Sequence, residues 1–211
     1  LTEYYGMTEG GGTCILAAHE RPDKLHTVGR PAEGHDIRLI DENGREVGPG
    51  ETGEVVGRSP SMMLGYRNAP EKTQDAEWFD PQGRRYIRTG DVGRFDEDGF
   101  LVLLDRRKDM IISGGFNVYP RLIEEAIYQH PAVAEVSVIG VPDPYRGQHP
   151  KAFVKVKPGE PAPTLEDLKA FLKDRLGKHE MIGALEILAD LPKTAVGKIS
   201  KKDLYEREAR G

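Results

Sequence analysis

Turn-forming residues cut the first half of this chain into short segments, and this punctuation limits what the chain can fold into. The alternating residues 37–40 run directly into Asp-Glu-Asn-Gly at 41–44, which is a hairpin signal. Residues 53–57 and 100–104 are also strand-like, and the tight turn Asp-Glu-Asp-Gly at 96–99 precedes the latter. Strands at this spacing predict a small antiparallel barrel or sheet. We expect three aromatic side chains to lie in its core: Trp78, Phe79 and Tyr86.

The second half alternates between helical and strand-like patterns. Pro120 stands at the first turn of a segment with apolar residues on one helical face. Strand-like runs follow at 133–141 and 152–156. A capping box at 164–167 then opens a second helix, which we expect to stop at Gly177. This alternation predicts a small α+β domain.

The two patterns together predict an α+β protein with two parts. Residues 1–104 are expected to form a strand-rich, antiparallel, barrel-like subdomain. The boundary between the two parts falls at residues 105–108, and 109–211 are predicted to form a small α+β domain. Because the chain begins with Leu1 and a glycine-rich motif follows within five residues, we expect it to be the C-terminal part of a longer protein.

Composition excludes several classes of protein. The net charge of −5 argues against a nucleic-acid-binding protein, which usually has a basic face. No apolar run approaches the ~20 residues that a transmembrane helix needs. Cys14 is the single cysteine, so an internal disulfide is impossible and a cytoplasmic location is expected. The six histidines are scattered and do not suggest a metal cluster.

Four short motifs carry side chains suited to nucleotide chemistry. Residues 5–9, Tyr-Gly-Met-Thr-Glu, supply an aromatic ring, a glycine that permits close backbone approach, a hydroxyl and a carboxylate. Taken alone, they are also typical of a glycine-containing turn before a helix. The motif Arg-Thr-Gly-Asp at 88–91 ends in Asp91, whose carboxylate is a natural bidentate acceptor for a diol. The alternative is an ordinary turn aspartate after Gly90.

The other two motifs contain lysines. The charged run at 105–109, taken alone, is typical of a solvated linker, and it continues into a segment with paired glycines. Residues 192–198, Pro-Lys-Thr-Ala-Val-Gly-Lys, place Lys198 on a small turn, where a lysine is more often an ordinary surface residue. A mobile lysine is a point charge suited to neutralising charge that develops at a phosphate. This segment is not a Walker loop, because Ile199 occupies its Ser/Thr position.

In this order, the four motifs resemble those of the adenylate-forming ligases: acyl-CoA synthetases, luciferases and the adenylation domains of peptide synthetases. The resemblance covers nearly the whole chain. It implies that Tyr5, next to Gly6, stacks on adenine and that Thr8 bonds the α-phosphate. It also implies that Glu9 helps to hold Mg²⁺.

The resemblance assigns roles to the remaining motifs. Residues 1–104 would be the end of the large N-terminal domain, 105–108 a hinge at which the backbone rotates about Lys108, and 109–211 the small mobile domain. Asp91 and Arg106 would bind the ribose. Lys198 would bridge carboxylate and phosphate during adenylation and then swing away for thioester formation. A lysine at this position is a typical acetylation target in the family, which implies a lysine acetyltransferase as a partner. Three residues would line the tunnel for the pantetheine arm of CoA: Gly114, Gly115 and Phe116.

The implied reaction is that of a fatty-acid- or aryl-CoA ligase. ATP adenylates a carboxylic acid, the acyl group then passes to CoA, and AMP and pyrophosphate are released. ATP, Mg²⁺, CoA and a small carboxylic acid are therefore the expected ligands, and a homodimer would form through the large domain. In the family, the phosphate loop and most of the acyl pocket precede the first motif, so we expect the 211-residue chain alone to be inactive.

Two alternatives and the substrate remain open. The acyl group could pass to a carrier protein in place of CoA, or the chain could be a non-catalytic nucleotide-binding or interaction module. Both fatty and aryl acids fit the sequence. The glycine run at 10–12 could leave room for a bulky acyl group, but it could equally serve the backbone.

Overall fold

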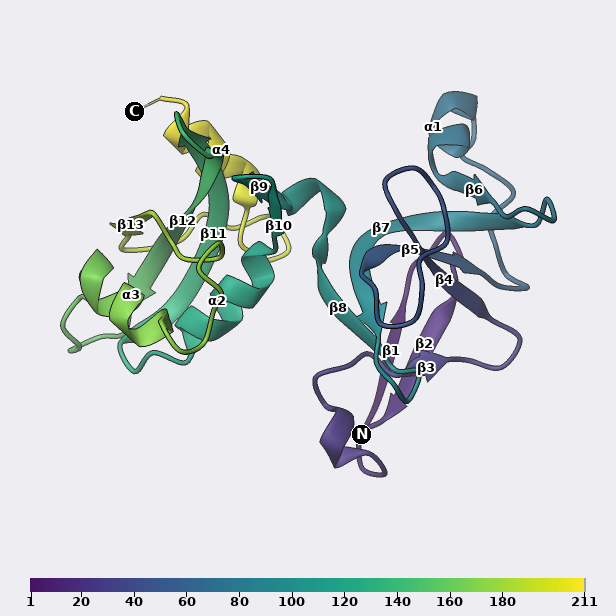
Figure 1. The fold of residues 1–211 in the computed structure, drawn as a ribbon, viewed down its shortest axis with the longest axis horizontal. Helices are drawn as coiled ribbons and strands as arrows, with labels where there is room; N and C mark the ends of the chain where they lie inside the picture. The colour runs from purple at the N-terminus through teal and green to yellow at the C-terminus, as the bar shows by residue number, and fades with distance from the viewer. Residues whose placement is uncertain (211) are drawn as a thin grey trace. The chain divides into compact units, whose positions relative to one another are not determined.

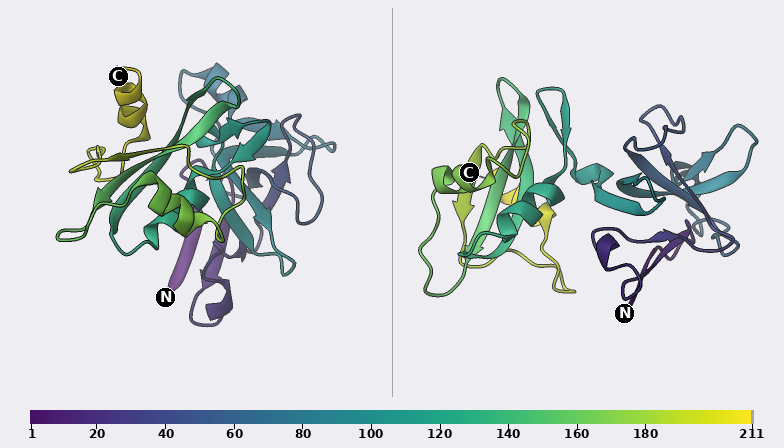
Figure 2. Two further views of the ribbon diagram at one scale, coloured as in Figure 1. Left: turned by 60° about the vertical axis from the view of Figure 1, so that its left-hand side comes forward. Right: turned by 60° about the horizontal axis from the view of Figure 1, so that its bottom comes forward.

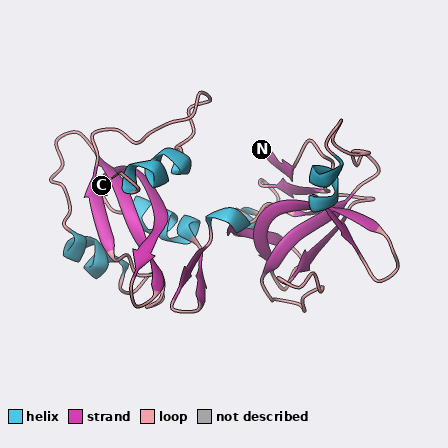
Figure 3. Ribbon diagram, turned by 90° about the horizontal axis from the view of Figure 1, so that it is seen from above, coloured by secondary structure: helices cyan, strands magenta, loops and turns pink. Residues whose placement is uncertain are grey.

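The computed structural model describes residues 1–210, which divide into two compact units, 1–107 and 108–210. The division falls within the segment that the sequence marks as a hinge. Each unit consists mainly of antiparallel strands with a few short helices (Figure 3), which confirms the predicted α+β class. In the described part of the chain, no helix is both long and apolar enough to cross a membrane.

Unit 1 contains two hydrogen-bonded sheets (Figure 1). The first has the order β1–β2–β3, and the second has the order β4–β5–β7–β6 with β8 also paired to β7. Its strands are β1 (Thr2–Gly6), β2 (Thr13–Ala17), β3 (Arg30–Pro31), β4 (Asp36–Ile40), β5 (Gly53–Arg58), β6 (Glu77–Phe79), β7 (Arg85–Phe95) and β8 (Leu101–Arg106). Its helices are η1 (Pro22–Lys24) and α1 (Pro70–Asp75), and η2 (Arg107–Asp109) spans the boundary between the units.

A shared core joins the two sheets of unit 1. It contains apolar side chains from β2, β4, β5 and β8: Cys14, Ile37, Leu39, Val55 and Leu101. The hydrogen bonds between the backbones of Val28 and Leu101, and of Leu101 and Gly29, also link the segment before β3 to β8. The predicted strands therefore exist, but they form two sheets on one core.

The aromatic prediction for unit 1 is correct at two positions and wrong at one. Trp78 and Tyr86 are buried and pack edge to face, with ring centroids 5.1 Å apart. Phe79 is instead 55% exposed. Consecutive side chains of a strand point to opposite faces, so β6 cannot bury both Trp78 and Phe79 in the same core.

Unit 2 is a five-stranded sheet with helices on both faces (Figure 2). The strand order is β10–β9–β12–β11, and β13 pairs parallel to β12. The strands are β9 (Ile111–Ser113), β10 (Phe116–Val118), β11 (Val133–Asp143), β12 (Gly147–Val156) and β13 (Ala184–Ile187). The helices are α2 (Pro120–Tyr128), α3 (Leu165–Leu172) and α4 (Lys201–Glu208).

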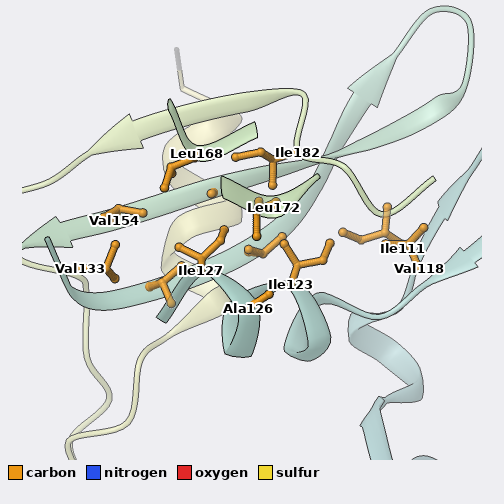
Figure 4. Packing of buried hydrophobic residues seen from close by; sticks show 13 residues of the cluster. Ile111, Val118, Ile123, Ala126, Ile127, Val133, Val154, Leu168, Leu172 and Ile182 are labelled. Carbon is orange, nitrogen blue, oxygen red and sulfur yellow. The ribbon is translucent and has the colours of Figure 1, made fainter. Parts of the chain in front are cut away.

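Alternation along β11 and β12 produces a separate core on each face of this sheet. Side chains from α2 and α3 meet one face, and Figure 4 shows them pointing toward one another. This larger core includes Ile123, Ile127, Val136, Val138, Ala152, Val154, Leu168 and Leu172. The smaller core on the opposite face includes Ile139, Val141, Phe153, Leu191 and Leu204, the last of which belongs to α4.

The predicted capping box of α3 is present. The Thr164 hydroxyl accepts a hydrogen bond from the backbone N–H of Asp167 (3.2 Å), and the Asp167 carboxylate accepts one from the backbone N–H of Thr164 (2.9 Å). The helix ends at Leu172, before the predicted stop at Gly177.

The glycine run after the first motif serves the backbone. Gly10 and Gly12 have φ angles of 74° and 87°, in the left-handed region that favours glycine. A Cβ atom at Gly10 would lie 2.5 Å from the carbonyl oxygen of Ser61, and one at Gly11 would lie 2.9 Å from the sulfur of Met7. Protein atoms thus fill the space beside these glycines, so the run gives no support to a bulky acyl pocket.

We expect Leu168→Ala to lower the free energy of unfolding of unit 2 by about 2–5 kcal/mol, because it leaves a cavity in the larger core. Urea unfolding followed by far-UV circular dichroism measures this change. Trp78, the single tryptophan, lies in unit 1, so its fluorescence transition should not shift. The exposed Val196→Ala is the control. An equal shift of both transitions would show that the two units do not unfold independently.

We expect Gly10→Ala to destabilise unit 1 by roughly 2–4 kcal/mol, since it adds backbone strain to a clash with Ser61. The matched control is Gly34→Ala, which has a φ of 75° but no atom within 4 Å of the new Cβ. It should be destabilised by only about 1 kcal/mol. Trp78 fluorescence during urea unfolding measures the free energy of unfolding of both variants. Equal effects would mean that the Ser61 contact is unimportant.

Candidate active site

Asp91 connects three strands of unit 1. The Tyr5 hydroxyl on β1 donates a hydrogen bond to Asp91 Oδ2 at 2.7 Å. Arg106 on β8 places its Nε atom 2.8 Å from Asp91 Oδ1. Asp91 and Arg106 are also direct partners in the β7–β8 register. Three of the residues that the motifs single out therefore meet, although Tyr5 and Asp91 are 86 positions apart.

The backbone around Asp91 is held by Thr89 and Gly90. The Thr89 hydroxyl donates to the carbonyl of Val55 (2.9 Å) and accepts from the backbone N–H of Asp91 (3.0 Å). Gly90 has a φ angle of 72°, in the left-handed region that favours glycine, and it lies where the pairing of β7 with β5 is irregular. A register shift between Val92 and Gly93 follows on the same strand. The Thr-Gly-Asp sequence thus fixes where the carboxylate points.

Tyr5 is a permanent hydrogen-bond donor in this arrangement. Its ring packs against the core of unit 1, and burial raises the pKa of its hydroxyl, with the nearby Asp91 carboxylate adding to the shift. The hydroxyl therefore stays protonated at physiological pH. Each carboxylate oxygen has two lone pairs, so Asp91 can accept further hydrogen bonds from a diol beside those from Tyr5 and Arg106.

The first motif lies at a hairpin between two strands, not before a helix. Gly6 ends β1, Thr8 is exposed in the turn, and β2 follows the glycine run. Glu9 is half-buried, and its Oε1 atom accepts a hydrogen bond from the Tyr66 hydroxyl at 2.9 Å. Glu9 in turn raises the pKa of Tyr66 through this bond.

The carboxylate oxygens of Glu9 are metal ligands that suit Mg²⁺ bound to a nucleotide. Such an ion is usually held by one or two carboxylates together with phosphates and waters. Across residues 1–210, no group of three or more His, Cys, Asp or Glu side chains could hold a metal by itself. Glu9 offers one carboxylate with one oxygen fixed by Tyr66. It suits an ion that brings its other ligands with it.

A buried carboxylate pairs with two arginines close to the end of unit 1. Glu54 on β5 has its Oε2 atom 2.7 Å from Nη1 of Arg88 and 3.0 Å from Nη1 of Arg107. Two guanidinium groups compensate the desolvation of this acid. Arg107 immediately precedes Lys108, so Glu54 fixes the side chain next to the expected hinge residue.

Lys198 is exposed on a small hairpin that is closed by its own hydrogen bonds. The backbone N–H of Thr194 donates to the carbonyl of Lys198 at 2.7 Å, and the Thr194 hydroxyl accepts from the backbone N–H of Lys198 at 3.2 Å. Gly197 has a φ angle of 81° in this turn. At the base, Lys193 pairs with Glu135 of β11 at 2.9 Å. The turn is thus ordered and attached to the sheet.

Lys108 lies near the base of the same hairpin. A surface pocket of about 580 Å³ in unit 2 is lined by Lys108, by Thr194 and Ile199 from the hairpin, and by Lys202 and Tyr205 from α4. The structure therefore brings the expected hinge residue and the Lys198 hairpin to one part of unit 2.

The expected CoA-tunnel residues form the β9–β10 hairpin. Gly114 and Gly115 have φ angles of 59° and 83° and make the turn. The backbone N–H of Gly114 donates to the carbonyl of Arg146 at 2.9 Å, which fixes this hairpin to the β11–β12 turn. Phe116 is exposed and stacks on His179, with ring centroids 5.0 Å apart.

Sequence reasoning missed the partners of the motif residues. Tyr66 contacts Glu9 from 57 positions away, and His179 stacks on Phe116. Nothing in the sequence indicates His179, because a lone histidine in a polar segment has no pattern.

Two family descriptions match the chain: AMP-binding enzyme over residues 1–67, and AMP-binding enzyme C-terminal domain over residues 122–198. Long-chain-fatty-acid–CoA ligase of Bacillus subtilis is 42% identical over 209 residues, which are 99% of this chain and 36% of that protein. Fatty acid–[acyl-carrier-protein] ligase ScoC of Streptomyces coeruleorubidus is 37% identical over 211 residues, covering 98% of this chain and 40% of that protein. The chain thus spans about two fifths of the length of these relatives.

A solved structure shares the fold. It is the o-succinylbenzoate coenzyme A synthetase MenE of Bacillus subtilis in complex with ATP and a magnesium ion, with 34% identity and a TM-score of 0.81. The match covers 94% of this chain and 40% of that chain. On these matches to both parts of the chain, the protein belongs to the AMP-binding, or adenylate-forming, enzyme superfamily and contains the family's C-terminal domain.

Proposed function

We propose that the full-length protein is an AMP-forming acyl-CoA synthetase that activates a carboxylic acid with ATP and transfers the acyl group to CoA. The observation that carries this proposal is the meeting of Tyr5, Asp91 and Arg106, with contacts of 2.7 and 2.8 Å. An aromatic ring, a diol acceptor and a cation side by side are what a nucleoside site requires. Relatives that are fatty-acid ligases support the acid and thiol chemistry.

Each motif residue has a proposed role. Asp91 and Arg106 bind the ribose, and Tyr5 both orients Asp91 and offers its ring to adenine. Thr8 bonds the α-phosphate. Glu9 would hold Mg²⁺, which supplies charge neutralisation at the phosphates when it is bound with ATP.

Lys198 is proposed to supply the cation for the first step. The substrate carboxylate attacks the α-phosphorus and pyrophosphate leaves, so negative charge accumulates where a lysine point charge is effective. The ordered hairpin fixes the backbone of Lys198 on unit 2, and the exposed side chain extends from it. Rotation about 105–108, with Lys108 as the pivot, would remove it before thioester formation.

In the second step the CoA thiol attacks the acyl-adenylate and AMP leaves. We propose that the β9–β10 hairpin lines the path of the pantetheine arm. This proposal is supported by the glycine turn, which presents little bulk, and by Phe116, an exposed apolar ring beside it.

Fatty acids are the proposed substrate class, with aryl acids as the competing one. The proposed setting is the cytoplasm, and Lys198 remains a predicted acetylation site.

A carrier-protein acceptor is the second candidate function. The relative ScoC, whose name gives a fatty acid and an acyl carrier protein, matches nearly the whole chain at 37% identity. The acceptor is tested by offering the full-length protein ATP, Mg²⁺ and a panel of fatty and aryl acids with either CoA or a phosphopantetheinylated carrier protein. Acid-dependent pyrophosphate exchange without CoA thioester would favour the carrier protein. Neither product from any acid would favour the non-catalytic module.

We expect Lys198→Ala in the full-length protein to reduce acid-dependent pyrophosphate exchange by roughly 100-fold or more, because one preorganised cation is removed from the first step. Thioester formation from a supplied acyl-adenylate should persist. Lys202→Ala removes an exposed lysine of α4 and should change neither rate by more than about twofold. If both lysine variants lose exchange equally, a general electrostatic effect and not a specific role of Lys198 is responsible.

We expect Asp91→Asn to raise the KM for ATP about tenfold or more. The substitution replaces the charged carboxylate with a neutral amide and removes the ion pair with Arg106. The KM for CoA should stay within twofold. Asp75→Asn, at the exposed end of α1, is the control. An unchanged KM for ATP in the folded variant would remove Asp91 from the nucleotide site.

A further inference from the structure

Tyr66 is an exposed tyrosine whose hydroxyl is nevertheless committed to one acceptor. It donates to Oε1 of Glu9 at 2.9 Å, between segments 57 residues apart in sequence. The side chain is 38% exposed, so this hydroxyl could have been satisfied by water. The effect of the hydrogen bond is to hold the carboxylate in one rotamer.

The segment that presents Tyr66 is fixed to the Glu9 region by backbone contacts. The backbone N–H of Met63 donates to the carbonyl of Glu9 at 2.9 Å. The Ser59 hydroxyl donates to the carbonyl of Gly10 at 2.8 Å. These bonds keep residues 59–63 against the first motif, independently of any contact by the Tyr66 side chain.

Tyr66 is also held from its other side. Its backbone N–H donates to the Thr73 hydroxyl of α1 at 2.9 Å, and that hydroxyl donates to the carbonyl of Ala69 at 3.1 Å. In addition, the Arg85 guanidinium donates to the carbonyl of Met63 at 2.6 Å. The phenol therefore extends from an anchored backbone, and its hydroxyl has a defined position.

We propose that Tyr66 is a positioning residue for the cation that accompanies ATP. Its hydroxyl donates to Oε1 of Glu9 and restrains the carboxylate, and Oε2, which does not accept from Tyr66, is the oxygen that we assign to the ion. Mg²⁺ demands strict geometry and takes carboxylates through one oxygen, and hydrogen bonds to ligating carboxylates orient them. This inference rests on the proposed adenylation function, because it assumes that Glu9 faces a nucleotide-bound cation.

Tyr66→Phe in the full-length protein tests the proposal, since it removes the hydroxyl and keeps the ring. The probe is Mn²⁺, a paramagnetic substitute for Mg²⁺, titrated by electron paramagnetic resonance with saturating α,β-methylene-ATP. We expect the Mn²⁺ affinity to fall roughly tenfold. The KM for the carboxylic acid should remain unchanged. Tyr145→Phe, at a fully solvated ring, is the matched control and should leave the Mn²⁺ affinity as it is.

A double-mutant cycle separates positioning from a general structural effect. In a Glu9→Ala background, Tyr66→Phe should change the Mn²⁺ affinity by less than twofold, because its target is absent. An unchanged Mn²⁺ affinity in the single variant, or an equal loss in both backgrounds, would overturn the proposal.

The experiments distinguish a failure of the Tyr66 proposal from a failure of the proposed function. If the wild-type protein forms no adenylate from any acid but Tyr66→Phe still weakens Mn²⁺ binding through Glu9, the proposed catalysis is wrong and the role of Tyr66 stands.

Discussion

The geometry of the candidate site depends on one carboxylate that joins three strands. Asp91 on β7 contacts Tyr5 on β1 and Arg106 on β8. These strands belong to two different sheets, so the site forms only when the shared core of unit 1 has brought the sheets together. The contact between Asp91 and Tyr5 spans 86 residues. The arrangement of these three side chains is therefore tied to long-range packing, not to any single motif.

Local signals in the sequence predicted much of the fold. The capping box of α3, the alternating strands and the burial of Trp78 and Tyr86 are each properties of neighbouring residues, and the structure confirms them. Helix α4 was missed because Leu204 is its single buried residue, which leaves no helical apolar period to detect. Its Ser200 cap, whose hydroxyl accepts from the backbone N–H of Asp203, was the available signal.

The site was predictable as a set of residue types, but not as a set of contacts. Motif order indicated Asp91, Glu9 and Lys198, since each is a chemical group at a characteristic spacing. The partners that orient them are set by tertiary structure: Tyr66 reaches Glu9 from a separate loop. The glycine run shows the opposite limit. Its small residues suggested space for a ligand. In the structure, Gly10 and Gly12 are required instead by their positive φ angles and by protein atoms close to where a Cβ would lie.

The closed hairpin around Lys198 has a consequence for conformational entropy. Because Thr194 already fixes both backbone groups of Lys198, the turn has no ordering left to undergo when the lysine meets its target. Only the four side-chain torsions of the lysine become restricted, a loss of roughly 2 kcal/mol in TΔS. A disordered loop of seven residues would lose several times as much, at about 1–2 kcal/mol for each residue fixed. In the proposed reaction cycle, the ordered hairpin would let the ammonium group approach and leave the site without a folding step.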